Sequence, residues 1–201
     1  MKPEIKHYPN IQALSQAAAG FVVKLAEECV KKRKIFTVAL SGGNTPRPLY
    51  KLLTQAPYVN SIPWAHTHLF WGDERYVPAD HPDSNFAMAS QALIVHVPIP
   101  FQNVHRIPTE PASPEEAAES YEQTLRNLFE IFGSLTDNGR LRVFDLMLLG
   151  IGKDGHTASL FPDSLVLVEQ RRWVAATPVP HLNPPVRRIT LTFPVINAAR
   201  N

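Results

Sequence analysis

The stretch VFDLMLLGIGKDGHTASLFP, residues 143–162, passes from an apolar run directly into a glycine-rich loop. A short apolar run bounded by glycine is typical of a buried strand that ends in a turn. Gly150, Gly152 and Gly155 also spell the G-x-G-x-x-G pattern of dinucleotide-binding loops, but His156 follows the last glycine. The stretch predicts a strand that leads into a ligand loop, and it leaves open whether that loop binds a cofactor or carries a base.

Helical and strand-like segments alternate along the rest of the chain. Apolar spacing predicts helices over 11–34, 47–55 and 113–132, the last capped by Ser113 with Glu116, and a loop from 72 that runs into a helix ending near 93. Short β-rich runs predict strands over 35–40, 67–71, 142–150, 172–177 and 187–193. This alternation predicts an α/β fold: a mostly parallel sheet flanked by helices, in a Rossmann-like three-layer sandwich, with ligands beyond the carboxyl ends of the strands.

Length and composition indicate one soluble globular domain over residues 1–201. The chain is 44% hydrophobic and 19% charged, and no apolar run approaches the roughly 20 residues of a membrane span. The first ten residues lack the apolar stretch of a signal peptide, so we expect a cytoplasmic monomer without membrane contacts. A net charge of +2 gives no reason to expect a nucleic-acid partner. Cys29 is the single cysteine, which excludes an internal disulfide, and we expect it to be buried on a helix.

Three glycine-containing loops follow successive predicted strands. They are SGGNTP at 41–46, GDER at 72–75 and GIGKDGH at 150–156. Parallel strands end at one edge of their sheet, so we expect the three loops to form one site.

The loop SGGNTP has the features of a phosphate cradle. Gly42 and Gly43 permit a close approach of the backbone to a ligand, and the start of the next helix offers free N–H groups. Ser41 and Thr45 add hydroxyl groups. The loop is too short for a P-loop and lacks its lysine. The alternative is a plain strand-to-helix turn, with Thr45 as the cap and Pro46 in the first helical position.

Arg75 in GDER has a planar guanidinium that suits a phosphate or a carboxylate. A structural ion pair with Asp73 or Glu74 is the alternative, and we expect structural roles for these two acids. The Asp-Ser-Asn run at 83–85 precedes a helix and is expected to cap it.

The position of the glycine motif argues against a dinucleotide cofactor. Such loops follow the first strand of their fold, whereas this one begins at residue 150 of 201. His156 suits catalysis better, because an imidazole takes a proton from water near neutral pH and Asp154 can orient it. A plain hydrogen-bonding role is the alternative. A Ser-His-Asp triad lacks its G-x-S-x-G motif, and His66 and His68 share a strand face without a third ligand, so we expect neither metal nor cofactor.

Four segments together resemble the 6-phosphogluconolactonase family, within a larger group of sugar-phosphate isomerase-like and deaminase-like proteins. They are SGGNTP, FWGDERYVP, DLMLLGIGKDGHTASLFP and PPVRRITLTFPVINAA. The resemblance implies cofactor-free hydrolysis of 6-phosphoglucono-δ-lactone to 6-phosphogluconate in the oxidative pentose phosphate pathway. It implies that His156 activates water beside Asp154, that Arg75 and the Ser41–Gly43 turn hold the substrate, and that Arg188 adds a polar contact. Main-chain N–H groups of the glycine loop, such as that of Gly152, would then steady the oxyanion.

The family continues past INAA into a further strand and a final helix, with a G-x-x-K lysine near the phosphate. This sequence ends at Asn201, so we expect a lactonase domain without those elements. Three other functions stay open at this point. They are a sugar-phosphate deaminase or isomerase, a non-catalytic phosphosugar-binding module, and a dinucleotide-dependent oxidoreductase.

Overall fold

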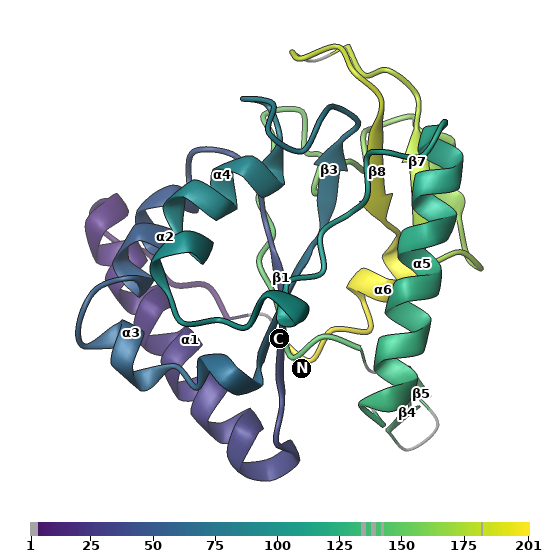
Figure 1. The fold of residues 1–201 in the computed structure, drawn as a ribbon. Helices are drawn as coiled ribbons and strands as arrows, with labels where there is room; N and C mark the ends of the chain where they lie inside the picture. Colours follow the sequence, from purple (N-terminus) through teal and green to yellow (C-terminus); the bar gives the residue numbers. More distant parts are fainter. Residues whose placement is uncertain (1–3, 134–135, 138–139, 142, 182) are drawn as a thin grey trace.

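The structure, a computed structural model, describes residues 4–133, 136–137, 140–141, 143–181 and 183–201. A parallel three-stranded sheet lies at its centre, where β1 (Phe36–Leu40) pairs with β2 (Thr67–Trp71) on one side and β6 (Leu146–Met147) on the other. All residues of β1 are buried, because helices cover the sheet on both sides (Figure 1). The predicted α/β class is confirmed.

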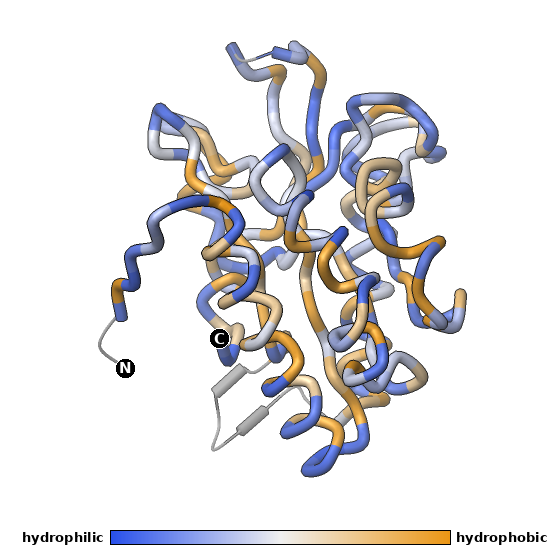
Figure 2. Tube along the Cα trace, turned by 90° about the vertical axis from the view of Figure 1, so that its left-hand side faces the viewer, coloured by the Kyte–Doolittle hydropathy of each residue, from blue (hydrophilic) through white to orange (hydrophobic). Residues whose placement is uncertain are grey.

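The helices fall into two groups on opposite sides of β1 (Figure 1). On one side lie α1 (Ile11–Arg33), α2 (Arg47–Leu53), α3 (Tyr58–Ser61) and α4 (Asn85–Ala92), and on the other lies α5 (Pro114–Ile131). In Figure 2 the N-terminal segment and the topmost loops are mostly hydrophilic, and hydrophobic stretches run through the middle of the molecule. Smaller elements complete the fold: η1 (Trp64–His66), η2 (Ile94–His96), η3 (Phe101–Asn103), β4 (Thr136–Asp137), β5 (Arg140–Leu141), η4 (Leu165–Val168) and α6 (Phe193–Ile196).

A second sheet is antiparallel, in the order β3–β8–β7. Its strands are β3 (Asp73–Arg75), β7 (Val174–Thr177) and β8 (Arg188–Leu191). The predicted strands near 172–177 and 187–193 therefore exist, but they run antiparallel to each other. The prediction of a loop at 73–75 was wrong, because these polar residues pair with β8 although they carry no β-rich signal.

Gly72 connects the two sheets. Its N–H donates to the carbonyl of Leu40 at 3.0 Å, and its own carbonyl accepts the N–H of Leu191 at 2.9 Å. One continuous stretch from β2 into β3 thus belongs to both sheets. The site at the end of the parallel sheet is therefore bordered by antiparallel strands.

The third parallel strand is shorter than the prediction of 142–150. The ladder covers Leu146–Met147, flanked by bonds from the N–H of Asp145 to Thr37 and from the N–H of Leu148 to Ala39. Residue 142 lies outside the described residues. Beyond Leu148 the chain turns away, and this turn begins the glycine-rich loop.

The helix ends test several capping predictions. Ser113 accepts the N–H of Glu116 at 3.2 Å at the start of α5, as expected. Ser84 caps α4 by accepting the N–H of Ala87 at 3.1 Å, so the cap predicted at 83–85 is confirmed at its middle residue. The alternative role of Thr45 as a cap is wrong, because α2 begins after Pro46 without a side-chain cap. Cys29 is buried on α1, as predicted.

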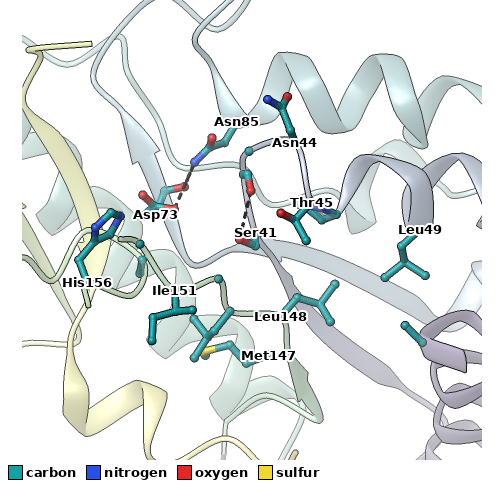
Figure 3. Close-up of a pocket in the computed structure, with 18 of the residues that line it drawn as sticks. Ser41, Asn44, Thr45, Leu49, Asp73, Asn85, Met147, Leu148, Ile151 and His156 are labelled. Atoms are coloured by element: carbon teal, nitrogen blue, oxygen red, sulfur yellow. Dashed lines mark hydrogen bonds between the residues drawn. The ribbon is translucent and has the colours of Figure 1, made fainter. Parts of the chain in front are cut away.

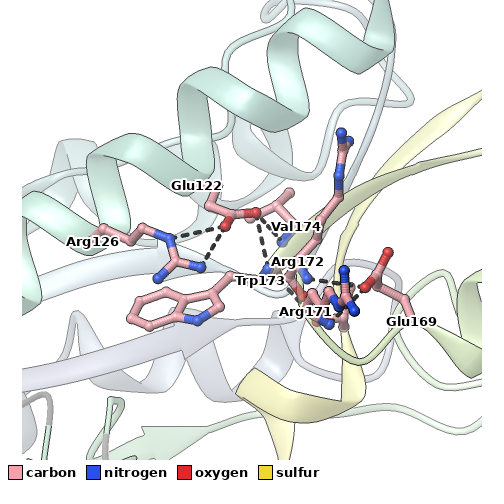
Figure 4. Close-up of polar contacts among 8 residues, drawn as sticks. Glu122, Arg126, Glu169, Arg171, Arg172, Trp173 and Val174 are labelled. Atoms are coloured by element: carbon pink, nitrogen blue, oxygen red, sulfur yellow. Dashed lines mark hydrogen bonds and ion pairs between the residues drawn. The ribbon is translucent and has the colours of Figure 1, made fainter.

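Glu122 ties α5 to the antiparallel sheet (Figure 4). One carboxylate oxygen accepts the N–H groups of Trp173 and Val174, at 2.9 and 3.3 Å. The other accepts Arg126 at 2.7 Å, and the Arg126 guanidinium lies 4.4 Å from the Trp173 ring centroid. This helix thereby fixes the strand that supports β8.

Candidate functional site

A cleft of about 690 Å³ opens at the carboxyl ends of β1 and β6. The loops that follow β1, β2 and β6 all contribute to its lining, together with residues of α1, as Figure 3 shows in part. The predicted convergence of the three glycine loops is confirmed. Every predicted site residue except Asp154 lines the cleft: Ser41, Gly42, Gly43, Thr45, Arg75, Gly152, His156 and Arg188.

His156 is held by a tight turn. Its Nδ1 lies 2.5 Å from Oδ1 of Asp154, and the hydrogen bond from the imidazole holds the pKa of that carboxyl below its usual range. This contact favours the tautomer with the proton on Nδ1, which leaves the lone pair on Nε2. Gly155 takes the left-handed conformation, with φ of 87°. A side chain on Gly152 would begin 2.2 Å from the His156 ring, so only glycine fits there.

The Ser41–Thr45 turn is fixed from below by the buried Tyr50. The Tyr50 hydroxyl accepts the N–H of Ser41 at 3.0 Å and donates to its carbonyl at 2.8 Å. Gly43 has φ of 88°, a conformation that favours glycine. Within the described part of the chain, the N–H groups of Gly42 and Gly43 donate to no acceptor. These groups fit an anion that the turn would receive.

Arg75 and Arg188 lie opposite each other in the ladder between β3 and β8. Arg188 is only 4% exposed, and its pKa is lowered by burial and by the charge of Arg75. The Nε atoms of both side chains are buried without a partner among the described residues. Two neighbouring guanidinium groups at a cleft are suited to a multiply charged anion.

The alternative of an ion pair for Arg75 is wrong. Arg75 donates from Nη1 to the main-chain oxygen of Asp83 at 2.7 Å, and among the described residues it pairs with neither Asp73 nor Glu74. Glu74 instead accepts the N–H groups at the start of α4, at 2.7 and 2.8 Å. Burial raises the pKa of this carboxyl. Its predicted structural role is confirmed.

Three residues of the site were missed by the sequence analysis. Asp73 and Asn85 line the cleft, and Ser159 donates from Oγ to Asp73 at 2.6 Å. Ser159 lies between Thr157 and Leu160, which form a β-bridge. No local signal marks the contact between Ser159 and Asp73, because it joins two distant loops.

The structure contains no group of three or more His, Cys, Asp or Glu side chains placed to hold a metal, within its described residues. His68 contacts His105, with 3.0 Å between the ring nitrogens, rather than His66. In the same part of the chain, no helix has the length and apolarity to cross a membrane.

Comparisons with known proteins agree with this geometry. Residues 9–201 match the family model for glucosamine-6-phosphate isomerases and 6-phosphogluconolactonase. A 6-phosphogluconolactonase of Synechocystis sp. is 41% identical over 100% of this chain and 78% of its own length. The chloroplastic 6-phosphogluconolactonase 3 of Arabidopsis thaliana is 42% identical over 98% of this chain and 60% of its own.

A solved structure has the same fold. The 6-phosphogluconolactonase from Trypanosoma brucei aligns with a TM-score of 0.85 and 34% identity, over 100% of this chain and 80% of that one. The parallel strands, the glycine loops and the cleft are thus found in a chain whose sequence matches the family along nearly all its length. We conclude that this chain belongs to the glucosamine-6-phosphate isomerase/6-phosphogluconolactonase family.

Proposed function

We propose that this protein hydrolyses 6-phosphoglucono-δ-lactone to 6-phosphogluconate, a reaction of the oxidative pentose phosphate pathway. The observation that carries the proposal is the pair of His156 and Asp154, 2.5 Å apart, beside a cleft that also presents two arginines. The names of the Synechocystis and Trypanosoma brucei relatives support the same reaction.

The substrate phosphate is assigned to the polar side of the cleft. Arg75 and the N–H groups of Gly42 and Gly43 would contact its oxygens, and Ser41 and Thr45 add hydroxyl groups at the same turn. Arg188 would contact the substrate from the neighbouring strand. Hydrogen bonds between charged partners of this kind are stronger than those between neutral groups.

The chemical step uses His156 as a general base. Its Nε2 takes a proton from water while the water oxygen attacks C1 of the lactone, and Asp154 stabilises the imidazolium that forms. The tetrahedral intermediate then collapses with cleavage of the bond between C1 and the ring oxygen. The imidazolium returns the proton to that oxygen, which gives the open-chain carboxylic acid.

The glycine loop contributes differently from what its sequence predicts. The N–H of Gly152 donates to the carbonyl of His156 at 2.8 Å, and the N–H of Gly155 donates to Gly152 at 3.0 Å. Neither group is available for the oxyanion in this arrangement. We therefore assign Gly152 the role of making room for the imidazole ring, and the oxyanion to other donors of the cleft.

A cytoplasmic location and a monomeric state belong to the same proposal. The residues that line the cleft all come from one chain. Gel filtration with light scattering tests the monomer directly. A dimer would correct this part of the proposal without changing the reaction.

The test is an initial-rate assay with freshly prepared lactone. Formation of 6-phosphogluconate is followed through a coupled dehydrogenase and corrected for spontaneous ring opening. Parallel samples receive glucosamine 6-phosphate, with ammonia as the readout, or 6-phosphogluconate in a calorimeter. Accelerated lactone opening supports the proposal. Release of ammonia would identify a deaminase, and binding without turnover would identify a phosphosugar-binding module.

A further inference from the structure

The carboxylate of Asp73 lies between the turn that carries His156 and the Ser41–Thr45 turn. Asp73 begins β3 directly after Gly72, and it is 7% exposed. Its Oδ2 accepts the hydroxyl of Ser159 at 2.6 Å, and its Oδ1 accepts Nδ2 of Asn85 at 3.2 Å. Both carboxylate oxygens therefore have donors from the protein itself.

The first donor belongs to the loop that carries the base. Ser159 is fully buried three residues after His156, and its own N–H donates to Oγ1 of Thr190 at 3.2 Å. Ser159 is thus held by β3 through its side chain and by β8 through its main chain. The end of the His156 turn cannot shift relative to the antiparallel sheet without breaking these bonds.

The second donor supports the turn at Gly42. Asn85 is 2% exposed, and its Nδ2 also donates to the main-chain oxygen of Asp73 at 2.9 Å (Figure 3). A Cβ built on Gly42 would lie 1.8 Å from Oδ1 of Asn85, so the backbone of Gly42 rests directly on this amide. The position of Asn85 therefore sets how far the Ser41–Thr45 turn reaches into the cleft.

We propose that Asp73 is a positioning residue, which holds the His156 turn through Ser159 and the Gly42 turn through Asn85 and so fixes the distance between base and substrate. This inference rests on the proposed lactonase reaction. The contact with Ser159 supports the turn of His156, which acts as the base, and the contact with Asn85 supports the turn of Gly42, which binds the substrate. Loss of each contact is therefore expected to change a different kinetic constant. A misplacement of about 1 Å in such a geometry costs up to about 10²-fold in rate.

The test compares Ser159→Ala, Asn85→Ala and Asp73→Asn with Ser164→Ala as the matched control. Ser164 lies in the same loop region, where its hydroxyl accepts the N–H of Val166 and does not contact Asp73. We expect kcat of Ser159→Ala to fall about 10-fold to 100-fold with KM within about twofold of the parent. We expect Asn85→Ala to raise KM and the Kd of 6-phosphogluconate with a smaller change in kcat. The control should match the parent in both constants.

A double-mutant cycle separates positioning from direct catalysis. If Asp73 acts through Ser159, Asp73→Asn combined with Ser159→Ala should lose no more kcat than Asp73→Asn alone. Additive losses, or parental kcat in a folded Ser159→Ala, would overturn the proposal. If Ser159→Ala fails to fold, Asp73→Asn is used instead, because it keeps the size of the side chain. Parental kcat and KM in Asp73→Asn would also overturn the proposal.

A readout independent of activity separates this inference from the proposed function. Hydrogen exchange of residues 150–156 should be faster in Ser159→Ala than in Ser164→Ala, because the amides of Gly152 and Gly155 are bonded within the turn. Unchanged exchange would count against the positioning role even if the parent is an active lactonase. A parent without lactonase activity would refute the proposed function while the exchange experiment still reports on the turn.

Discussion

The buried charges at the two ends of the parallel sheet differ in how they are paired. At the amino end, Asp145 is paired with Arg33, and Arg200 lies 3.5 Å from the same carboxylate. Thr37 adds bonds from its N–H and hydroxyl, at 3.0 and 3.2 Å. At the carboxyl end, Arg75 and Arg188 face one cleft without such a partner in the described residues.

This difference separates stability from ligand binding. A carboxylate with two arginines is neutralised within the fold, and it joins the end of α1 to the start of β6. Two arginines that repel each other cost stability unless an anion arrives. The molecule thus has one charged cluster whose loss should lower the stability of the fold and another whose loss should weaken the proposed ligand binding.

Replacement of the base should give the largest effect. His156→Asn keeps a polar side chain but cannot accept a proton near neutral pH, so we expect kcat to fall by about 10² to 10⁴. The Kd of 6-phosphogluconate should stay within about twofold, a difference too small to reflect a lost contact. The measurement is the corrected initial rate, with the exposed His96→Asn as control. A variant with parental turnover would remove His156 from the catalytic role.

Asp145→Asn should act on stability alone. Removal of one partner leaves two arginine charges uncompensated, so we expect a loss of about 2 to 3 kcal/mol in the free energy of unfolding. The effect is below that of a fully buried pair because the arginine side chains are 30% and 27% exposed. Urea denaturation measures it, and kcat of the folded variant should match the parent. A loss of activity without a loss of stability would contradict the comparison.

Arg75→Ala should show the reverse pattern. We expect the Kd of 6-phosphogluconate to rise by the equivalent of about 1.5 to 3 kcal/mol, the contribution of a hydrogen bond to a charged group. The free energy of unfolding should change little, since loss of the bond to the main-chain oxygen of Asp83 is offset by removal of the like charge beside Arg188. Calorimetry and urea denaturation decide this, with the exposed Arg171→Ala as control. Unchanged affinity together with lower stability would return Arg75 to a structural role.

A histidine pair away from the cleft should give the smallest effect. Burial lowers the pKa of both His68 and His105 to about 4, below the usual value of 6.5. The unfolded chain therefore binds more protons between these values, so stability falls as the pH falls from 6.5 towards 4. We expect about 1 to 2 kcal/mol for the pair, because partial exposure screens the effect.

The measurement is the unfolding free energy of the parent and of His105→Gln at pH 7 and pH 4.5. The difference between the two proteins removes the contribution of carboxylates that titrate over the same range. The variant should lose less stability on acidification than the parent does. An equal loss in both proteins would mean that the pair is already protonated, or already solvated, in the fold.

Local sequence patterns are enough to predict the elements that form without contacts to distant residues. The long helix α1 and the strands β1 and β2 follow from apolar spacing, and the start of α5 follows from Ser113. The convergence of the glycine loops follows from strand direction, since parallel strands end at one edge. These features need no knowledge of distant contacts.

The rest depends on contacts between distant residues. Asp73–Arg75 becomes a strand only because β8 lies beside it, more than a hundred positions later in the chain. Ser159 and Asp73 are 86 residues apart, and no sequence spacing marks their bond. Whether Arg75 forms an ion pair or stays available for a ligand likewise depends on how the side chains of Asp73 and Glu74 are oriented. Asp73 and Glu74 both find other donors once the chain is folded.

The two hydrogen bonds between Tyr50 and Ser41 have a consequence for ligand entry. Because the hydroxyl satisfies both the N–H and the carbonyl of Ser41, we expect the turn to keep one shape whether or not the cleft is filled. The conformational entropy of this segment is then lost during folding rather than on association. The phosphate that we propose for this turn would meet donors already in place, so less of its binding energy would be spent on ordering the loop.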